Sequence, residues 1–150
     1  RPTPGNDQHQ LTARGPLFIR CQRSTIQPLP TDVWQWAGGN LERGETPWDG
    51  ARRECLEETG INFQGVQRLL GVHFVPQREH WPANHIGFIF DGGELGDAQL
   101  ARVRLTDEHT EWRVATVDEW RGEMTPVNFK RLEAIHTARE TGTVAYLEGL

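Results

Sequence analysis

The segment spanning residues 39–61, GNLERGETPWDGARRECLEETGI, constrains the fold of this chain more than any other. Thr46 has the sequence context of a helix N-cap, and Pro47 stands at the first helical position, where the missing N–H of proline is harmless. Gly60 supplies the left-handed residue that commonly ends a helix. The segment therefore predicts a glycine-rich turn followed by a helix over Pro47–Thr59.

Three carboxylates share one face of this predicted helix. Glu54, Glu57 and Glu58 stand at positions i, i+3 and i+4, where like charges destabilise a helix by roughly 0.2–0.5 kcal/mol per pair. They also lie toward the negative end of the helix dipole. A helix that bears such an unfavourable arrangement of charges with no local compensation is typical of a functional site. Clustered carboxylate oxygens suit a hard divalent cation, Mg²⁺ first and Mn²⁺ second.

The remaining features of the segment support such a site. Gly38 and Gly39 let the backbone of the turn approach a metal or a phosphate closely. Arg53 can reach Glu57 one turn along the helix, or an acid of the preceding loop such as Glu45, and either contact would fix the geometry of a carboxylate. A separate stripe of the helix is predicted to be its buried face: Trp48, Ala51, Cys55 and Thr59, with Leu56 at the edge.

This pattern resembles the Nudix box, G-x5-E-x7-R-E-U-x-E-E-x-G-U, in which U is a bulky apolar residue. The matching residues are Gly39, Glu45, Arg53, Glu54, Glu57, Glu58, Gly60 and Ile61. Cys55 replaces the first bulky aliphatic residue, a change that affects packing more than chemistry. The lead-in Trp34-x-Trp36-Ala37-Gly38-Gly39 also resembles the W-x-L-P-G-G of the family. With its flanks, the resemblance covers residues 12 to about 140.

The resemblance implies an α/β fold, a Nudix-type α/β/α sandwich with a mixed β-sheet and the catalytic loop-helix. It also implies metal-dependent hydrolysis of a nucleoside diphosphate linked to another group. Glu54, by preference, would help to activate water, and Glu45 would pair with Arg53 to orient the helix. A further metal ligand is expected downstream, at Glu111 or, as second choice, at Glu108. The implied catalytic residues are Glu54, Glu57, Arg53 and Glu45, and the implied metal ligands are Gly38 through its carbonyl, Glu54, Glu57, Glu58 and Glu111.

Substrate choice depends on residues outside the box. We expect Trp34, Arg78 and Trp81 to line the substrate pocket, although a loop tryptophan such as Trp81 more often covers core. Pro76 resembles a proline of the ADP-ribose-cleaving members, whereas the only tyrosine, Tyr146, lies too late for the pattern of diadenosine-polyphosphate cleavers. A nucleoside triphosphate, damaged or not, and an NDP-sugar or ADP-ribose therefore stay open. Trp36 and Trp48 are expected in the core.

Two other functions compete with a small-molecule hydrolase. A nucleotide-binding or regulatory domain without turnover would keep the fold but lose a box carboxylate, and none is lost. An RNA-processing enzyme would need a basic path for its substrate, and 16 basic against 21 acidic residues, a net charge of −5, argue against a nucleic-acid partner. A P-loop is not predicted, because Glu45 follows Gly44 where that motif has Lys, although Thr46 then matches its Ser or Thr.

The remaining predictions concern location and organisation. No apolar run approaches membrane-spanning length and no secretory leader is visible. Cys21 and Cys55 lie far apart, which indicates two free thiols and a cytoplasmic location, with a disulfide as the alternative. The resemblance leaves a homodimer open. It also predicts an edge strand that either precedes Arg1 or is degenerate here.

We expect a flexible segment over residues 1–11 and one domain over residues 12–150. Its predicted elements are strands over 16–23, 33–37, 66–74, 85–91 and 111–115, a helical turn over 117–120 and a second long helix starting at Thr125-Pro126.

Overall fold

The structure is a computed structural model that describes residues 17–21, 33–63, 65–79 and 83–149. The elements, in chain order, are β1 (Leu17–Cys21), β2 (Val33–Gln35), α2 (Pro47–Thr59), β3 (Leu69–Val75), β4 (His85–Phe90), α3 (Asp97–Leu100), β5 (His109–Val114), α4 (Val117–Arg121), α5 (Pro126–Thr141) and β6 (Ala145–Glu148). The predicted flexible segment over residues 1–11 lies outside the described residues, as does the question of an edge strand before β1.

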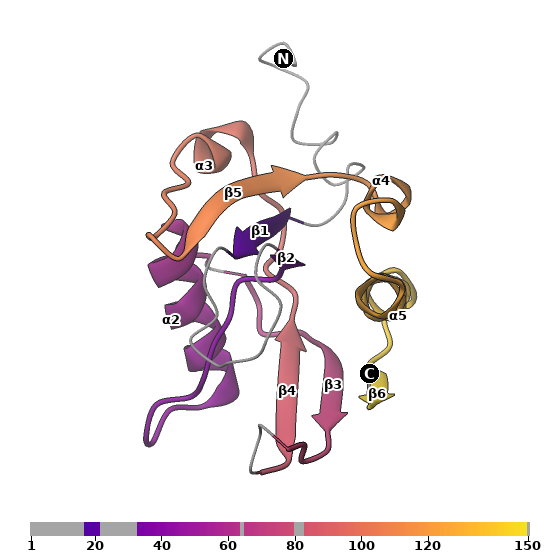
Figure 1. Ribbon diagram of the computed structural model, residues 1–150. Helices are drawn as coiled ribbons and strands as arrows, with labels where there is room; N and C mark the ends of the chain where they lie inside the picture. Colours follow the sequence, from indigo (N-terminus) through magenta and orange to yellow (C-terminus); the bar gives the residue numbers. More distant parts are fainter. Residues whose placement is uncertain (1–16, 22–32, 64, 80–82, 150) are drawn as a thin grey trace.

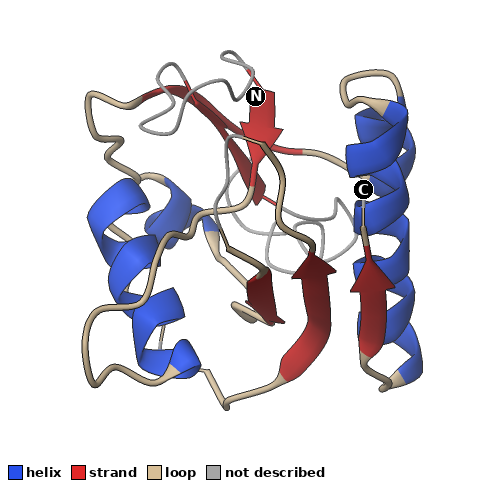
Figure 2. Cartoon of the chain, turned by 60° about the horizontal axis from the view of Figure 1, so that its bottom comes forward, coloured by secondary structure: helices blue, strands red, loops and turns tan. Residues whose placement is uncertain are grey.

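The described strands form two three-stranded sheets (Figure 1). The first has the order β2-β1-β5 with antiparallel neighbours. The second has the order β4-β3-β6, in which β3 pairs antiparallel with β4 and parallel with β6. Strands lie between α2 on one side and α5 on the other (Figure 2). The mixed strand directions and the two flanking helices agree with the predicted α/β class.

The predicted helix over Pro47–Thr59 is confirmed as α2 with the same bounds. The hydroxyl of Thr46 accepts a hydrogen bond from the Asp49 N–H at 3.2 Å. Gly60 has a φ of 76° and donates its N–H to the Leu56 carbonyl, so the left-handed residue closes the helix as expected. Such local cap chemistry explains why the bounds of this helix are readable from sequence.

The buried stripe of α2 is only partly as predicted. Thr59 is buried, and Trp48 packs edge-on against Phe63 and Phe90, with ring centroids 5.5 and 5.2 Å away. Leu56, expected at the edge of the stripe, is exposed. A second side of the helix is also buried, because Gly50 and Glu58 face the polypeptide that precedes the helix.

The hydrophobic core is formed by residues of β2, α4 and α5 and by Ala115, which follows β5. Its cluster consists of Trp34, Ala115, Trp120, Phe129 and Leu132, and Trp120 is completely inaccessible to solvent. The second long helix begins as predicted, with Thr125 accepting from the Asn128 N–H at 3.3 Å and Pro126 at the first turn. It buries Phe129, Leu132, Ile135 and Ala138 at helical spacing.

Two described elements were not predicted, and one strand begins later than predicted. α3 is a single helical turn with no apolar periodicity of its own, and β6 is a four-residue strand that exists because it pairs with β3. The predicted strand over 66–74 begins instead at Leu69. Val66 is 88% exposed and is not among the residues of β3 that pair with β4 or β6. Among the described residues, no helix has the length and apolar character needed to cross a membrane.

Candidate functional site

The glycine turn before α2 brings backbone directly against two of the predicted metal-binding carboxylates. The Gly38 N–H donates to Glu58 Oε2 at 2.7 Å. A Cβ at position 39 would overlap all three atoms of the Glu54 carboxyl group, so only glycine leaves room for that side chain. The carbonyl of Gly38 stays a predicted metal ligand.

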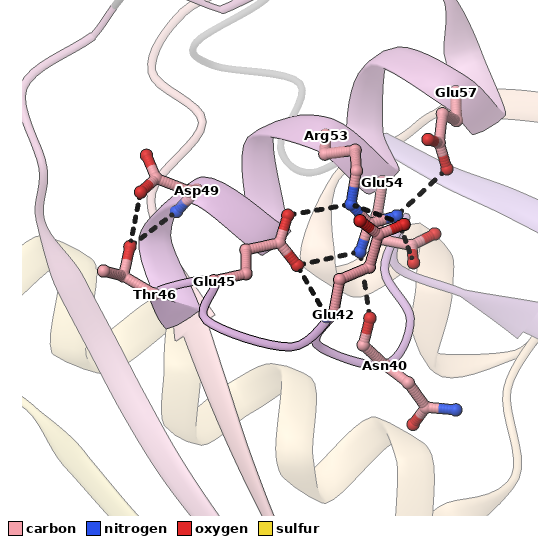
Figure 3. Close-up of polar contacts among 8 residues, drawn as sticks. All are labelled: Asn40, Glu42, Glu45, Thr46, Asp49, Arg53, Glu54 and Glu57. Atoms are coloured by element: carbon pink, nitrogen blue, oxygen red, sulfur yellow. Dashed lines mark hydrogen bonds and ion pairs between the residues drawn. The ribbon is translucent and has the colours of Figure 1, made fainter.

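Arg53 lies at the centre of the site and uses every N–H of its guanidinium (Figure 3). Nε and Nη2 donate to the two oxygens of Glu45 at 2.8 and 3.0 Å. Nη1 donates to Glu54 Oε1 at 2.9 Å and Glu57 Oε2 at 3.1 Å, and Nη2 donates to the Asn40 carbonyl at 2.9 Å. One guanidinium therefore links the loop to two acidic side chains of the helix.

The pair formed by Glu45 and Arg53 is electrostatically reinforced. Its bidentate geometry is the strongest arrangement available to a guanidinium and a carboxylate. The hydrogen bond from Arg53, followed by one from the backbone of Glu42, holds the pKa of Glu45 below its ordinary value. The pKa of Arg53 is raised by its bonds to Glu45 and Glu54. Both groups therefore stay charged across the physiological range, as an orienting pair requires.

Glu58 is the most buried of the three helix carboxylates, with 12% of its side chain exposed. Burial raises its pKa to about 7, the bond from Gly38 opposes that rise, and the charges of Glu54, Glu108 and Glu57 add to it. A carboxylate surrounded by other carboxylates and shielded from water is one that a cation would stabilise in its charged form.

His109 belongs to the site and was missed by sequence reasoning. Only 1% of its side chain is exposed, and its Nε2 lies 3.6 Å from Glu58 Oε1. Burial lowers the pKa of the imidazole, so the ring is neutral. No spacing relates His109 to the box, because the contact arises from β5 packing beside α2.

The downstream acids occupy different positions. Glu108 directly precedes β5, and its charge raises the pKa of both Glu58 and His109. Glu111 lies within β5, opposite Arg20 in the register, and is exposed. Its charge is not among those that raise the pKa of Glu58. Of the two downstream acids, Glu108, the second choice, is therefore the one whose charge acts on a helix carboxylate.

Within the described part of the chain, no three His, Cys, Asp or Glu side chains are grouped so that they could hold a metal ion as they stand. Arg53 explains why the helix carboxylates are not grouped around one point, since it binds the carboxylates of Glu54 and Glu57 itself. Glu57 is the easier of the two to release, because 56% of its side chain is exposed against 17% for Glu54.

The predicted substrate-binding residues do not come together. Trp34 is 7% exposed and packs edge-on against Trp120 in the core, with centroids 5.1 Å apart, so its burial does not support a contact with substrate. Arg78 is exposed in the loop after β3. Trp81 lies outside the described residues. Trp36 is partly buried against the core cluster, as expected.

A family model, curated proteins and solved structures all match this chain. The NUDIX domain family model matches residues 11–135. An RNA pyrophosphohydrolase of Rhodopseudomonas palustris (strain BisB18) is 38% identical over 60 residues, which are 39% of this chain and 33% of that protein. An RNA pyrophosphohydrolase of Afipia carboxidovorans is 28% identical over 123 residues, covering 69% of this chain and 70% of that protein.

The crystal structure of the MutT protein from Methanosarcina mazei Go1 matches with a TM-score of 0.62 and 25% identity, over 83% of each chain. These matches confirm the expected fold and the resemblance drawn from the box. The chain spans a third to a half of the length of the curated relatives that it matches first.

Proposed function

Because the chain belongs to the NUDIX family of hydrolases, we propose that it is a divalent-metal-dependent enzyme that cleaves a diphosphate bond in a nucleotide-type substrate. Mg²⁺ is the first choice of metal and Mn²⁺ the second. The observation that carries the proposal is the placement of Glu54, Glu57 and Glu58 on one face of α2, with Glu54 and Glu57 bound by Arg53 and Glu58 bound by the Gly38 N–H.

The donor set fits a hard divalent cation. It consists of carboxylate oxygens. Burial, and after it the charges of neighbouring carboxylates, raise the pKa of Glu58, and a positive charge among these groups would favour its charged form. We assign metal binding to Glu54, Glu57, Glu58 and the Gly38 carbonyl. Glu108 is the supported downstream ligand, since its charge acts on Glu58.

The chain's own residues have distinct proposed roles. A bound cation would neutralise diphosphate charge and lower the pKa of bound water. Arg53 holds Glu54 Oε1 at 2.9 Å, which leaves Oε2 as the atom proposed to take a proton from the attacking water. Glu45 keeps Arg53 in place through its bidentate contact, so it acts as a positioning residue.

The net charge and the names of the relatives bear on the proposed substrate class. A net charge of −5 favours a small nucleotide over a long nucleic acid, whose backbone needs a basic path. The relatives named RNA pyrophosphohydrolase nevertheless add 5′-triphosphorylated RNA to the candidates, because its scissile group is also a chain of phosphates. A domain that binds nucleotide without turnover is the alternative function.

The proposal extends to location and assembly. Cys55 is a free thiol, which supports the predicted reducing, cytoplasmic location. A homodimer stays a prediction that light scattering on the purified protein would decide.

A substrate panel with and without Mg²⁺ tests the function. It should contain nucleoside triphosphates, oxidised dGTP, ADP-ribose, NADH, diadenosine polyphosphates, nucleotide sugars and 5′-triphosphorylated RNA. We expect metal-dependent release of phosphate from one class, abolished in Glu57→Gln and kept in Glu94→Gln, a matched change at an exposed glutamate far from the box. Turnover that persists in EDTA would refute the metal requirement, and silence across the panel with Mg²⁺ bound would favour the domain without turnover.

A further inference from the structure

The ring of His109 contains a buried polar atom that the fold leaves unsatisfied. Its Nε2 is inaccessible to solvent and has no hydrogen-bond partner among the described residues. The nearest acceptor is Glu58 Oε1 at 3.6 Å, just beyond hydrogen-bond distance. Buried polar atoms without partners are rare and cost about 1–3 kcal/mol, so one that faces a proposed metal ligand requires an explanation.

The backbone around His109 holds the ring firmly against α2. The His109 N–H donates to the Thr106 carbonyl at 3.1 Å, and His109 pairs with Cys21 across the antiparallel strands β5 and β1. The Arg104 N–H donates to the carbonyl of Thr59 at 2.8 Å, which ties the segment before β5 to the last turn of α2. The position of the imidazole relative to Glu58 is therefore set by the fold.

The other ring nitrogen of His109 faces Thr106, whose hydroxyl can pair with either tautomer. This hydroxyl lies 3.1 Å from His109 Nδ1, and a hydroxyl can donate there as well as accept. When the hydroxyl donates, Nδ1 is the acceptor and the hydrogen of the neutral ring sits on Nε2, directed toward Glu58. The other tautomer would point a lone pair of Nε2 at a carboxylate oxygen, which is repulsive at 3.6 Å.

We propose that His109 is a positioning residue for Glu58, whose two carboxylate oxygens are held by different donors. The Gly38 N–H bonds Oε2 at 2.7 Å, and the Nε2–H of His109 faces Oε1. A shift of less than about 1 Å completes the second bond. The two donors leave each oxygen a lone pair for a cation, and Thr106 fixes the direction of the donor.

This inference rests on the proposed function, because it assumes that Glu58 binds metal. Groups that hydrogen-bond to a metal ligand typically contribute about 10- to 100-fold to metal affinity. We therefore expect His109→Phe, which keeps a flat ring but removes the donor, to weaken Mn²⁺ binding by about 10- to 100-fold. His109→Gln, whose amide can place an N–H near the position of Nε2, should restore most of the affinity.

The experiment measures Mn²⁺ binding by electron paramagnetic resonance, without substrate. Thermal melting in EDTA identifies which variants are folded. Thr106→Val and Thr106→Ser form a second pair that leaves the ring in place: the valine should weaken binding and the serine should not. Nitrogen chemical shifts of the ring should report the Nε2–H tautomer in the wild-type protein with and without metal.

The outcomes separate the two proposals. Wild-type protein that binds no Mn²⁺, or binds it equally after Glu58→Gln, overturns the metal assignment and this inference with it. Binding that depends on Glu58 but is unchanged in His109→Phe and Thr106→Val overturns the role of His109 alone. A ring whose hydrogen sits on Nδ1 in the metal-bound protein would make Nε2 a ligand itself and also overturn it.

Discussion

Replacing Glu58 by glutamine should stabilise the metal-free protein at neutral and alkaline pH. The folded state raises the pKa of this carboxyl from 4.5 to about 7, chiefly through burial. Between those two values the folded state keeps the proton that the unfolded chain has released. Stability therefore falls as pH rises through this window and stays lower above it. Glutamine carries no charge and is free of that loss.

The size of the effect follows from the pKa. Each tenfold change in the ionisation equilibrium is worth about 1.4 kcal/mol, so the charged carboxylate costs the folded state about 3 kcal/mol above pH 7. Solvent screening at a side chain that is 12% exposed reduces this to about 2–3 kcal/mol. For a chain of 150 residues this corresponds to about 5–10 °C in melting temperature.

Thermal melting of wild type and Glu58→Gln in EDTA, from pH 5 to pH 8.5, tests the prediction. The two curves should lie closest together at pH 5 and separate progressively toward pH 8. Glu57→Gln is the matched control, because it removes the same charge from the same helix at a side chain that is 56% exposed. Saturating Mg²⁺ should reverse the order, since only the wild type gains binding energy at Glu58. A separation that does not depend on pH would refute the reasoning.

Two further changes test the geometry around Arg53 and the glycine turn. Gly39→Ala should lower turnover about 10- to 100-fold, because its Cβ displaces the Glu54 carboxylate. Gly38→Ala is the control and should stay near wild type, because its Cβ meets nothing within 4 Å. Equal effects of the two changes in steady-state kinetics would contradict this reasoning. Arg53→Lys should lower kcat by a similar factor, because an ammonium group cannot replace a planar guanidinium that donates five hydrogen bonds. Arg43→Lys, at an exposed position, serves as its control. An unchanged kcat in Arg53→Lys would show that positive charge alone suffices.

The parts of this molecule that sequence could predict are those fixed by local chemistry. The bounds of α2 follow from Thr46, Pro47 and Gly60, each acting within a few residues of the helix end. The pairing of Glu45 with Arg53 was implied by the Nudix box, and the structure has that contact. The cap residues of α2 are close in sequence to the groups that they bind, and Glu45 and Arg53 belong to a sequence motif whose members are expected to pair.

The parts that sequence could not predict depend on packing between distant segments. β6 is short and carries an exposed tyrosine, and it forms only because β3 offers an edge for pairing. His109 reaches Glu58 because β5 lies beside the last turn of α2, which no spacing in the chain encodes. The same packing brings the charge of Glu108 to act on Glu58, whereas Glu111 lies within β5 and is exposed.

The contacts of Arg53 show how a helix bearing three acids can fold without a cation. Its guanidinium partly neutralises Glu54 and Glu57. The charge repulsion that the spacing of the helix carboxylates predicts is therefore largely offset by a residue of the same helix. Among the described residues Glu58 has no guanidinium partner: the Gly38 N–H bonds one oxygen and His109 Nε2 lies 3.6 Å from the other. Its raised pKa is the remaining imbalance. A cation would therefore gain most at Glu58, and it could recruit Glu57 by breaking one exposed contact with Arg53. The bond between Arg53 and Glu54 would then remain to orient the proposed base.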